Sequence, residues 1–427
     1  MTYKEAMTYI RNTAAFGTKL GLDNIRALMS LLGDPQEKLK IIHIAGTNGK
    51  GSVAAYLLSV LRHAGYRVGS YTSPELFRFS ERIKTGYEEI SEDDIALYAS
   101  KVKAAADHMK ENSMGEPSEF ELVLAMAFCF FLDRNVDIVI LEAGLGGRLD
   151  ATNVISHSVL SVITKISFDH MQYLGDTLPQ IAAEKAAIIK PQGTALVYPA
   201  SEDVMNVFRR ECETKNATLK IAALPERISA SLSGGQTFLL SDKTYKTRMA
   251  GLYESDNAAL AIQALEMLEG YGVSVSEDDI CDGIRDAIWP GRFEILSSDP
   301  CIIADGAHNE DGAAALSETL SAYFDKVPLV LCIGILKDKQ YHEMLSRLLP
   351  HASSVIACTV PNPRSLSASA LSGVIHEIRP DLPVTETSDI DQALAEIKKL
   401  QRSAAAVVIC GSLYLVGPLR ERWIKDS

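Results

Sequence analysis

Residues 40–52 read KIIHIAGTNGKGS, and they set the expectation for the whole first half of the chain. An apolar strand is expected over Lys40–Ala45, a glycine-rich turn follows, and a helix is expected over Ser52–Ala64. A strand that passes through glycines directly into a helix gathers backbone N–H groups and a helix N-terminus at one point, which suits an anion. The stretch therefore predicts a phosphate-binding turn.

The spacing of this turn departs from the familiar phosphate loop, G-x-x-x-x-G-K-[ST]. Ile44 stands where that loop has its first glycine, and Gly51 separates Lys50 from Ser52. The alternative is an ordinary strand-to-helix turn with an exposed lysine, but such a turn needs only one glycine. We therefore predict that six consecutive residues bind phosphate groups: Thr47, Asn48, Gly49, Lys50, Gly51 and Ser52.

Apolar runs of strand length alternate with longer segments of helical period, which is the α/β pattern. Further strands are expected at 66–74, 136–144 and 159–167, and an apolar helix at 119–135. The strand at 136–144 is so apolar that both of its faces must be covered. We expect a mostly parallel sheet with right-handed crossovers, and a site formed by the loops after the carboxyl ends of its strands.

The alternation pauses at 288–300, where two prolines, a glycine and a polar turn interrupt it, and restarts at 301. Strands are then expected at 301–309, 328–336, 353–360 and 405–417. We therefore predict two domains. The first, 1–296, is the phosphate-loop domain, and the second, 297–427, is a smaller Rossmann-like α/β domain.

Composition excludes several classes of protein. The chain has 427 residues, 47% of them hydrophobic and 23% charged, and its net charge of -13 argues against a nucleic-acid or anionic-membrane surface. The longest apolar run, Leu122–Leu132, is too short to cross a bilayer, and the N-terminus has no apolar signal core. Seven cysteines are scattered singly without a C-x-x-C pair. Reduced thiols in a cytoplasmic protein are the simplest account.

Acidic and basic residues follow several of the expected strands. Glu142 ends an apolar strand, a position typical of the carboxylate that holds Mg²⁺ in nucleotide sites, although a helix-capping role is the alternative. The glycines after it do not make G-x-G-x-x-G, so a dinucleotide site is not indicated. His170 follows the next strand. A lone histidine is more often structural than a ligand, but at the same sheet edge as Glu142 and Ser73 it could be a metal ligand or a phosphate contact.

Three later segments carry weaker signals. Lys185 lies in a helix, where most lysines are solvated, and the residues around it give no reason to favour it. Arg292 lies on the expected linker, from which it could reach a γ-phosphate, although a surface arginine is the alternative. Asp305 and His308, in DGAHN, follow a strand and could hold a ribose or a phosphate.

Ten motifs occur along the chain in a fixed order. They are AGTNGKGS, SYTSPEL with ERI, FELVLAMAFCFF, LEAGLGGRLDATN, FDHMQYLG, EKAAIIKP, WPGRFE, DGAHN, GILKDK and GSLYLVG. Together they closely resemble the motifs of the folylpolyglutamate synthase/dihydrofolate synthase family, a branch of the Mur-ligase superfamily. The resemblance runs from about residue 16 to residue 420.

The resemblance implies a fold and a reaction. An N-terminal P-loop domain of the Mur-ligase central type would bind ATP and two Mg²⁺ ions, and a C-terminal Rossmann-like domain would close over it. ATP would phosphorylate the carboxylate of a pteroyl substrate, and the amine of L-glutamate would attack the acyl phosphate. The acceptor would be a reduced folate such as tetrahydrofolate, with or without dihydropteroate as a second acceptor, and the enzyme would be a cytoplasmic monomer.

The resemblance also assigns roles by position. Lys185 matches a lysine that the family carbamylates, and the resulting carboxylate-like group can face a metal. Gly51 occupies the place of the usual Mg²⁺-binding hydroxyl, which Ser73 would replace from the next strand.

The implied metal ligands are Ser73, Glu142, His170 and carbamylated Lys185. The implied nucleotide contacts beyond the turn are Asn257, Arg292, Asp305 and His308. The implied pterin contacts are Ser118, Phe120, Asp150 and Ala151. Catalysis would rest on Lys50, His170, Lys185 and Arg292.

The chain departs from the family pattern at several positions. Glu75 replaces the histidine of S-P-H-L, GLYESDN replaces a histidine–glutamine pair before Asn257, KAAI replaces KAGI, and Glu310 replaces a proline. The phosphate turn, Glu142, Lys185 and Arg292 are retained. Two alternatives therefore stay open: a Mur-ligase-superfamily enzyme that acts on another carboxylate, and a nucleotide-binding paralogue without catalysis.

Overall fold

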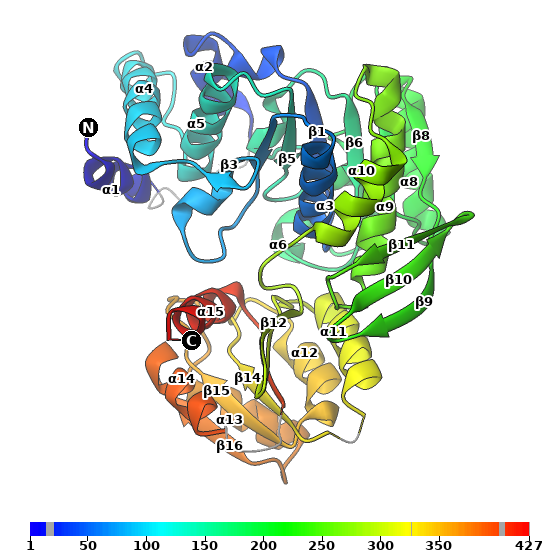
Figure 1. Cartoon of the computed structure of the whole chain (residues 1–427). Coiled ribbons are helices and arrows are strands. Elements are labelled where there is room, and N and C mark those ends of the chain that lie inside the picture. The colour runs from blue at the N-terminus through cyan, green and yellow to red at the C-terminus, as the bar shows by residue number, and fades with distance from the viewer. Residues whose placement is uncertain (14–20, 326, 401–405, 427) are drawn as a thin grey trace. The chain divides into compact units, whose positions relative to one another are not determined.

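A computed structural model describes residues 1–13, 21–325, 327–400 and 406–426 of the chain (Figure 1). Backbone contacts divide it into two compact units. The first unit comprises Met1–Leu224 and Asn257–Ile284, and the second comprises Pro225–Asp256 and Arg285–Ser427. The segment 225–256, which the sequence pattern places in the first domain, thus has its contacts in the second unit. The domain limits 1–296 and 297–427 stay a prediction.

An eight-stranded sheet forms the centre of the first unit, in the order β4-β3-β2-β5-β1-β6-β7-β8. Strands β2, β5, β1, β6, β7 and β8 are parallel, and β3 and β4 extend one edge in antiparallel fashion. The strands are β1 Ile41–Ala45, β2 Val68–Tyr71, β3 Ile83–Thr85, β4 Glu88–Glu89, β5 Ile138–Glu142, β6 Leu160–Ile163, β7 Thr194–Val197 and β8 Thr218–Ile221. The predicted α/β class with a mostly parallel sheet is confirmed.

Helices cover the first sheet and connect its parallel strands. They are α1 Tyr3–Thr13, α2 Asp23–Leu31, α3 Lys50–His63, α4 Glu92–Glu111, α5 Glu119–Asp133, α6 Met171–Leu174, α7 Leu178–Ala186, α8 Glu202–Lys215, α9 Glu254–Leu268 and α10 Glu277–Asp286. The helix predicted over Ser52–Ala64 begins two residues earlier, at Lys50, because Gly49 has a left-handed conformation and caps it.

Helix α5 is apolar nearly all round because it is enclosed on every side. Its residues 121–131 are all buried, and they share one core with α1, α2, α4 and the strands β1 and β5. A second cluster joins α7 and α8 to the ends of β1 and β6 through Ala45 and Ile163. Both clusters hold the strand ends that precede the predicted site.

The second unit contains a six-stranded sheet and a separate three-stranded antiparallel sheet, in the orders β12-β13-β17-β14-β15-β16 and β11-β10-β9. In the larger sheet the strands are parallel except for the edge strand β12. The strands are β9 Glu226–Ser231, β10 Gly235–Leu240, β11 Lys243–Thr247, β12 Glu294–Ser298, β13 Cys301–Ala304, β14 Leu329–Ile333, β15 Ser354–Cys358, β16 Val384–Thr387 and β17 Ala406–Cys410.

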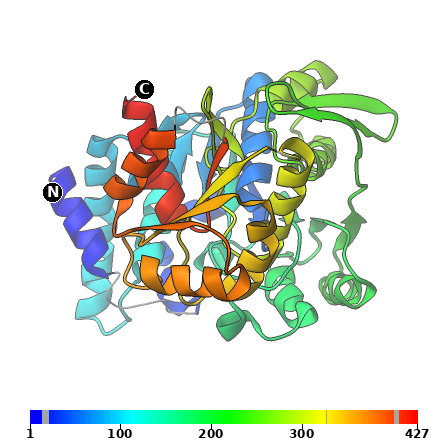
Figure 2. The ribbon, with the colours of Figure 1, turned by 90° about the horizontal axis from the view of Figure 1, so that it is seen from below.

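Helices lie on both faces of this six-stranded sheet (Figure 2). Helices α11, α12 and α13 share a core with one face, whereas α14 and α15 contact the strands from the other. They are α11 Glu310–Tyr323, α12 Tyr341–Leu348, α13 Ala368–Ile378, α14 Ile390–Lys399 and α15 Leu413–Asp426. The strand expected at 405–417 is shorter than predicted: residue 405 lies outside the described residues, β17 ends at Cys410, and α15 begins at Leu413.

Two further findings bear on the sequence-based expectations. All seven cysteines are free thiols, and five of them are buried, as expected for a core role. Within the described part of the chain, no helix combines the length and the apolar character needed to cross a membrane.

Candidate functional site

The turn between β1 and α3 has a backbone that only glycine allows at two points. Gly46 has φ 148° and Gly49 has φ 90°. A Cβ atom on Gly46 would lie 1.8 Å from Oγ1 of Thr164, and one on Gly49 would lie 2.4 Å from Oδ1 of Asn257. Both glycines are therefore required by the turn itself. Asn257, which comes from α9, lies directly beside the turn, as its predicted nucleotide role requires.

Hydrogen bonds attach this turn to the segment that follows β6. The N–H of Thr47 donates to the carbonyl of Lys165 at 2.8 Å, and its hydroxyl donates to the carbonyl of Ser167 at 3.0 Å. Thr164 Oγ1 donates to the carbonyl of Asn48 at 2.7 Å. The turn is thus fixed before any ligand binds, which is the preorganisation that electrostatic stabilisation of phosphate requires.

Two lysines converge on the start of the turn. Lys50 Nζ donates to the carbonyls of Gly46 and Thr47, both at 3.1 Å, and Lys185 Nζ donates to the same Gly46 carbonyl at 2.8 Å. Lys185 is only 4% exposed. Burial, and then the charge of Lys50, lower the pKa of Lys185 to about 7, against the charges of Asp169 and Asp150. The structure therefore singles out a lysine that its own sequence context did not favour.

The predicted metal ligands follow neighbouring strands of the sheet. Glu142, the last residue of β5, is 5% exposed and pairs with Ile44 of β1. Ser73 lies two residues beyond β2, which pairs with β5, and its peptide bond to Pro74 is cis. The carboxyl ends of these strands are adjacent, so the hydroxyl and the buried carboxylate are at one edge of the sheet.

His170 lies on the loop after β6 and is half-exposed. Its backbone is left-handed, with φ 49°, and its N–H donates to Asp169 Oδ1 at 2.8 Å. Among the residues that the structure describes, no three His, Cys, Asp or Glu side chains are grouped as a metal site. The predicted set does not need such a group, because its oxygen ligands are a hydroxyl, one carboxylate and a carbamate. These hard oxygen donors suit Mg²⁺.

Two of the predicted pterin contacts, Phe120 and Asp150, lie on the same side of Gly144. Phe120, near the start of α5, packs edge-on against Tyr71, with ring centroids 5.8 Å apart. The Phe120 ring also lies against Gly144, where a Cβ atom would be 2.8 Å from it.

Ser118 caps α5 and binds Glu121, so it has a structural role in the described contacts. Asp150 is 5% exposed and accepts from the N–H groups of Leu145 and Thr152 at 2.8 and 3.0 Å.

A buried histidine behind Asp150 was missed from the sequence. Thr152 Oγ1 donates to Asp150 and lies 2.9 Å from Nε2 of His43, a fully buried residue of β1. Since the single hydroxyl proton of Thr152 goes to the Asp150 carboxylate, His43 must donate from Nε2. Burial raises the pKa of Asp150 and lowers that of His43. The available signal was a polar residue in the otherwise apolar strand IIHIA.

Glu75, the departure from the family histidine, binds an arginine. Arg82 donates to Glu75 Oε2 at 2.5 Å and to Glu119 Oε1 at 3.2 Å, and its side chain is 13% exposed. A second carboxylate therefore shares this arginine, and it belongs to Glu119, the residue directly before Phe120. Neither Arg82 nor Glu119 was identified from the sequence.

In the second unit, Asp305 is the centre of a buried network. Its carboxylate accepts from the Tyr253 hydroxyl at 2.5 Å, from the Phe293 N–H at 2.9 Å and from the Ala307 N–H at 2.8 Å.

Arg292 donates to the carbonyl of Gly291 at 3.1 Å. His308 Nδ1 lies 2.8 Å from the carbonyl of Gly306. The structure thus brings Arg292, Asp305 and His308 into one set of loops, and their contact with nucleotide stays a prediction.

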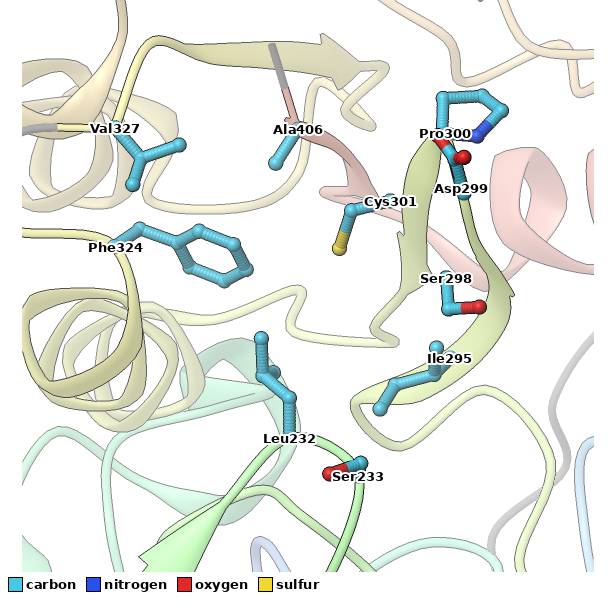
Figure 3. A pocket seen from close by; sticks show the side chains of 10 residues that line it. All are labelled: Leu232, Ser233, Ile295, Ser298, Asp299, Pro300, Cys301, Phe324, Val327 and Ala406. Carbon is cyan, nitrogen blue, oxygen red and sulfur yellow. The ribbon is translucent and has the colours of Figure 1, made fainter. Parts of the chain in front are cut away.

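A cavity of about 330 Å³ lies elsewhere in this unit (Figure 3). Phe324, Cys301 and Leu232 point into it. Its lining includes the first residues of β13 and β17, Cys301 and Ala406, so it opens at the amino ends of the parallel strands. Asp305 and His308 follow the carboxyl end of β13. The cavity is therefore distinct from the predicted site.

Two family models match the chain. The Mur ligase middle domain matches residues 44–265, and the Mur ligase glutamate ligase domain matches residues 291–413. The chain is 36% identical to a dihydrofolate synthase/folylpolyglutamate synthase of Bacillus subtilis, over 98% of this chain and 99% of that protein.

Solved structures agree with this assignment. Mycobacterium tuberculosis folylpolyglutamate synthase, complexed with ADP and AMPPCP, matches with a TM-score of 0.87 and 31% identity over 99% of both chains. Escherichia coli FolC, in complex with DHPP and ADP, matches with a TM-score of 0.86 and 28% identity over 100% of this chain and 98% of that one. The glycine turn, the two lysines that contact it and the order of the two matched domains agree with these relatives. The chain belongs to the folylpolyglutamate synthase/dihydrofolate synthase family.

Proposed function

We propose that the protein is an ADP-forming ligase that attaches L-glutamate to tetrahydrofolate and so builds folylpoly-γ-glutamate, with dihydropteroate as a second acceptor. The observation that carries the proposal is the convergence of Lys50 and Lys185 on the Gly46 carbonyl, at the head of a glycine-dependent phosphate turn. An idle nucleotide-binding protein has no need of a buried lysine there. The family membership selects the folate acceptors over other carboxylates.

The reaction needs activation of a carboxylate, which is a poor electrophile on its own. The acceptor carboxylate oxygen attacks the γ-phosphorus of ATP, the bond to the bridging oxygen breaks, and ADP leaves. The glutamate amine then attacks the acyl carbon, loses a proton and expels phosphate as the amide forms. Charge neutralisation and positioning by the turn N–H groups and Lys50 would supply most of the rate enhancement.

We further propose two Mg²⁺ ions, held by Ser73, Glu142, His170 and carbamylated Lys185. When bound, the ions would neutralise charge on the transferring phosphoryl group. Two features support this set. Glu142 is a buried carboxylate at the adjoining strand end, and the pKa of about 7 leaves a neutral fraction of Lys185 that can react with CO₂. Carbamylation would also turn the repulsion between Lys185 and Lys50 into attraction.

The remaining predicted contacts complete the proposal. Thr47, Asn48, Gly49, Gly51, Ser52 and Asn257 would contact nucleotide from the first unit, as would Arg292, Asp305 and His308 from the second. The pterin would be held by Phe120, Asp150 and Ala151, with Ser118 at the start of α5. We propose that the enzyme works as a monomer in the cytoplasm.

A substrate panel tests this function. The purified protein would be incubated with ATP, Mg²⁺ and L-glutamate together with dihydropteroate, monoglutamyl tetrahydrofolate or diglutamyl tetrahydrofolate. Mass spectrometry should show products heavier by one or more glutamyl residues. The expected result is extension of the tetrahydrofolates and addition of one glutamate to dihydropteroate. Absence of any glutamylated product from all three acceptors would overturn the proposal.

A further inference from the structure

Tyr253 lies in the segment GLYESDN, which departs from the family's usual histidine–glutamine pair. Its hydroxyl donates to Asp305 Oδ2 at 2.5 Å, and Asp305 is only 2% exposed. A hydrogen bond from a phenol to a buried carboxylate is charge-assisted and therefore stronger than a bond between neutral groups. Burial, and then the charge of Asp305, raise the pKa of Tyr253 well above its usual value, so the phenol keeps its proton.

The same carboxylate oxygen fixes the residue after Arg292. The N–H of Phe293 donates to Asp305 Oδ2 at 2.9 Å, and Phe293 has a left-handed backbone with φ 44°. A bulky residue adopts this conformation only where its surroundings hold it there. The buried ring of Phe293, with its centroid 5.7 Å from that of Tyr323, supplies one restraint. The Asp305 carboxylate supplies the other.

The guanidinium of Arg292 lies between two segments that Asp305 connects, residues 291–293 and residues 305–306. The N–H of Gly306 donates to the carbonyl of Gly291 at 2.7 Å, and Arg292 Nη1 donates to that same carbonyl. A Cβ atom on Gly306 would lie 1.9 Å from Arg292 Nη1, so the guanidinium lies directly on this backbone. The direction of the guanidinium therefore depends on the turn 291–293.

We propose that Tyr253 is a positioning residue, which sets the direction of Arg292 through the Asp305 carboxylate and the Phe293 N–H. This inference rests on the proposed role of Arg292 in nucleotide binding. Without the Tyr253 hydroxyl, the buried Asp305 oxygen loses one of its two donors, and the strained turn at Phe293 loses part of its restraint. The guanidinium of Arg292 then occupies its binding direction for a smaller fraction of the time.

The test is a double-mutant cycle on the affinity for a fluorescent, non-hydrolysable ATP analogue, with Tyr253→Phe and Arg292→Ala made singly and together. Tyr253→Phe should weaken binding about five- to tenfold in the wild-type background, and by less than twofold when Arg292 is already alanine. Tyr253→His, which restores a donor of the kind found in the family, should bind more tightly than Tyr253→Phe.

Tyr323→Phe is the matched control. Its hydroxyl donates to the carbonyl of Ala250 at 2.8 Å in the same unit, and its ring contacts Phe293 without reaching Asp305. This variant should keep wild-type affinity. An unchanged affinity of Tyr253→Phe, or an equal loss with and without Arg292, would overturn the inference.

Amide hydrogen exchange separates this inference from the proposed function. The N–H of Phe293 should exchange faster in Tyr253→Phe than in the wild type, and at the wild-type rate in Tyr323→Phe. If the wild-type protein binds no ATP analogue, the proposed nucleotide role fails, while the exchange rates still decide whether Tyr253 holds the turn. Equal protection of Phe293 in the wild type and in Tyr253→Phe would overturn the inference in either case.

Discussion

The ammonium groups of Lys50 and Lys185 share one acceptor, the carbonyl of Gly46, at 3.1 and 2.8 Å. Two cations on one carbonyl repel each other, and burial together with the charge of Lys50 lowers the pKa of Lys185 to about 7. The charge state of Lys185 is therefore the sensitive feature of this site. A neutral or carbamylated Lys185 would let Lys50 act alone as the cation at the phosphate turn.

Replacement of Lys185 by methionine should abolish most turnover while leaving nucleotide binding nearly intact. The loss in kcat should be roughly 10²- to 10³-fold, comparable to removal of one preorganised charged group. Steady-state kinetics and ADP affinity would be measured together. Lys215→Met is the matched control, because Lys215 Nζ also donates to backbone carbonyls, those of Ala187 and Ile189. Wild-type turnover in Lys185→Met would refute a catalytic role.

A carbamate on Lys185 should be visible by ¹³C NMR after incubation with ¹³C-labelled bicarbonate. The signal should be present at pH 8 and fade as the pH falls below about 7, because protonation of the amine competes with its reaction with CO₂. Lys185→Met should lack the signal at every pH. A wild-type spectrum without a carbamate resonance at pH 8 would contradict the proposed modification.

Gly49→Ala should destabilise the protein and weaken nucleotide binding. The new Cβ would meet Oδ1 of Asn257 at 2.4 Å, and alanine disfavours φ 90°. The cost in the free energy of unfolding should exceed about 1 kcal/mol. Gly270→Ala is the control, since a Cβ there meets no atom within 4 Å. Urea unfolding of both variants measures the difference, and equal stabilities would show that the turn tolerates a side chain.

Acid should destabilise the protein through His43. Burial holds the folded-state pKa of His43 well below the usual 6.5, so below pH 6.5 the unfolded chain binds a proton that the folded protein does not. The free energy of unfolding should therefore fall as the pH drops from 6.5, by at most about 1.4 kcal/mol per pH unit from this residue.

The variant His43→Gln isolates this contribution. Its unfolding free energy should change less between pH 7 and pH 5.5 than that of the wild type, whereas His108→Gln, on the exposed side of α4, should follow the wild type. Identical slopes for the wild type and His43→Gln would mean that His43 is not the buried neutral group inferred from its contact with Thr152.

The features that the sequence predicted well are local ones. The glycine turn between β1 and α3 follows from glycines whose spacing is set by the turn itself, and α5 follows from a run of apolar residues that only a buried helix accommodates. The α/β class follows in the same way from the alternation of short and long apolar segments.

The features that it missed depend on distant partners. The acceptor of Lys185 is the carbonyl of Gly46, far away in the sequence, and no local pattern marks such a contact. Two of the three donors to Asp305, the Tyr253 hydroxyl and the Phe293 N–H, come from other segments of the chain. The link between His43 and Thr152 joins β1 to the loop before β6. Strand β9 is largely exposed, so its residues gave no clear strand signal.

Release of ADP measured with each substrate omitted in turn is the most direct test of the central claim. ADP should appear at a steady rate only when ATP, Mg²⁺, L-glutamate and a pteroyl acceptor are all present, with one ADP formed for each glutamyl residue added. Lys50→Met should lose this activity. ADP release that does not depend on the acceptor and L-glutamate, or no release with any pteroyl acceptor, would contradict the assignment as a folate–glutamate ligase.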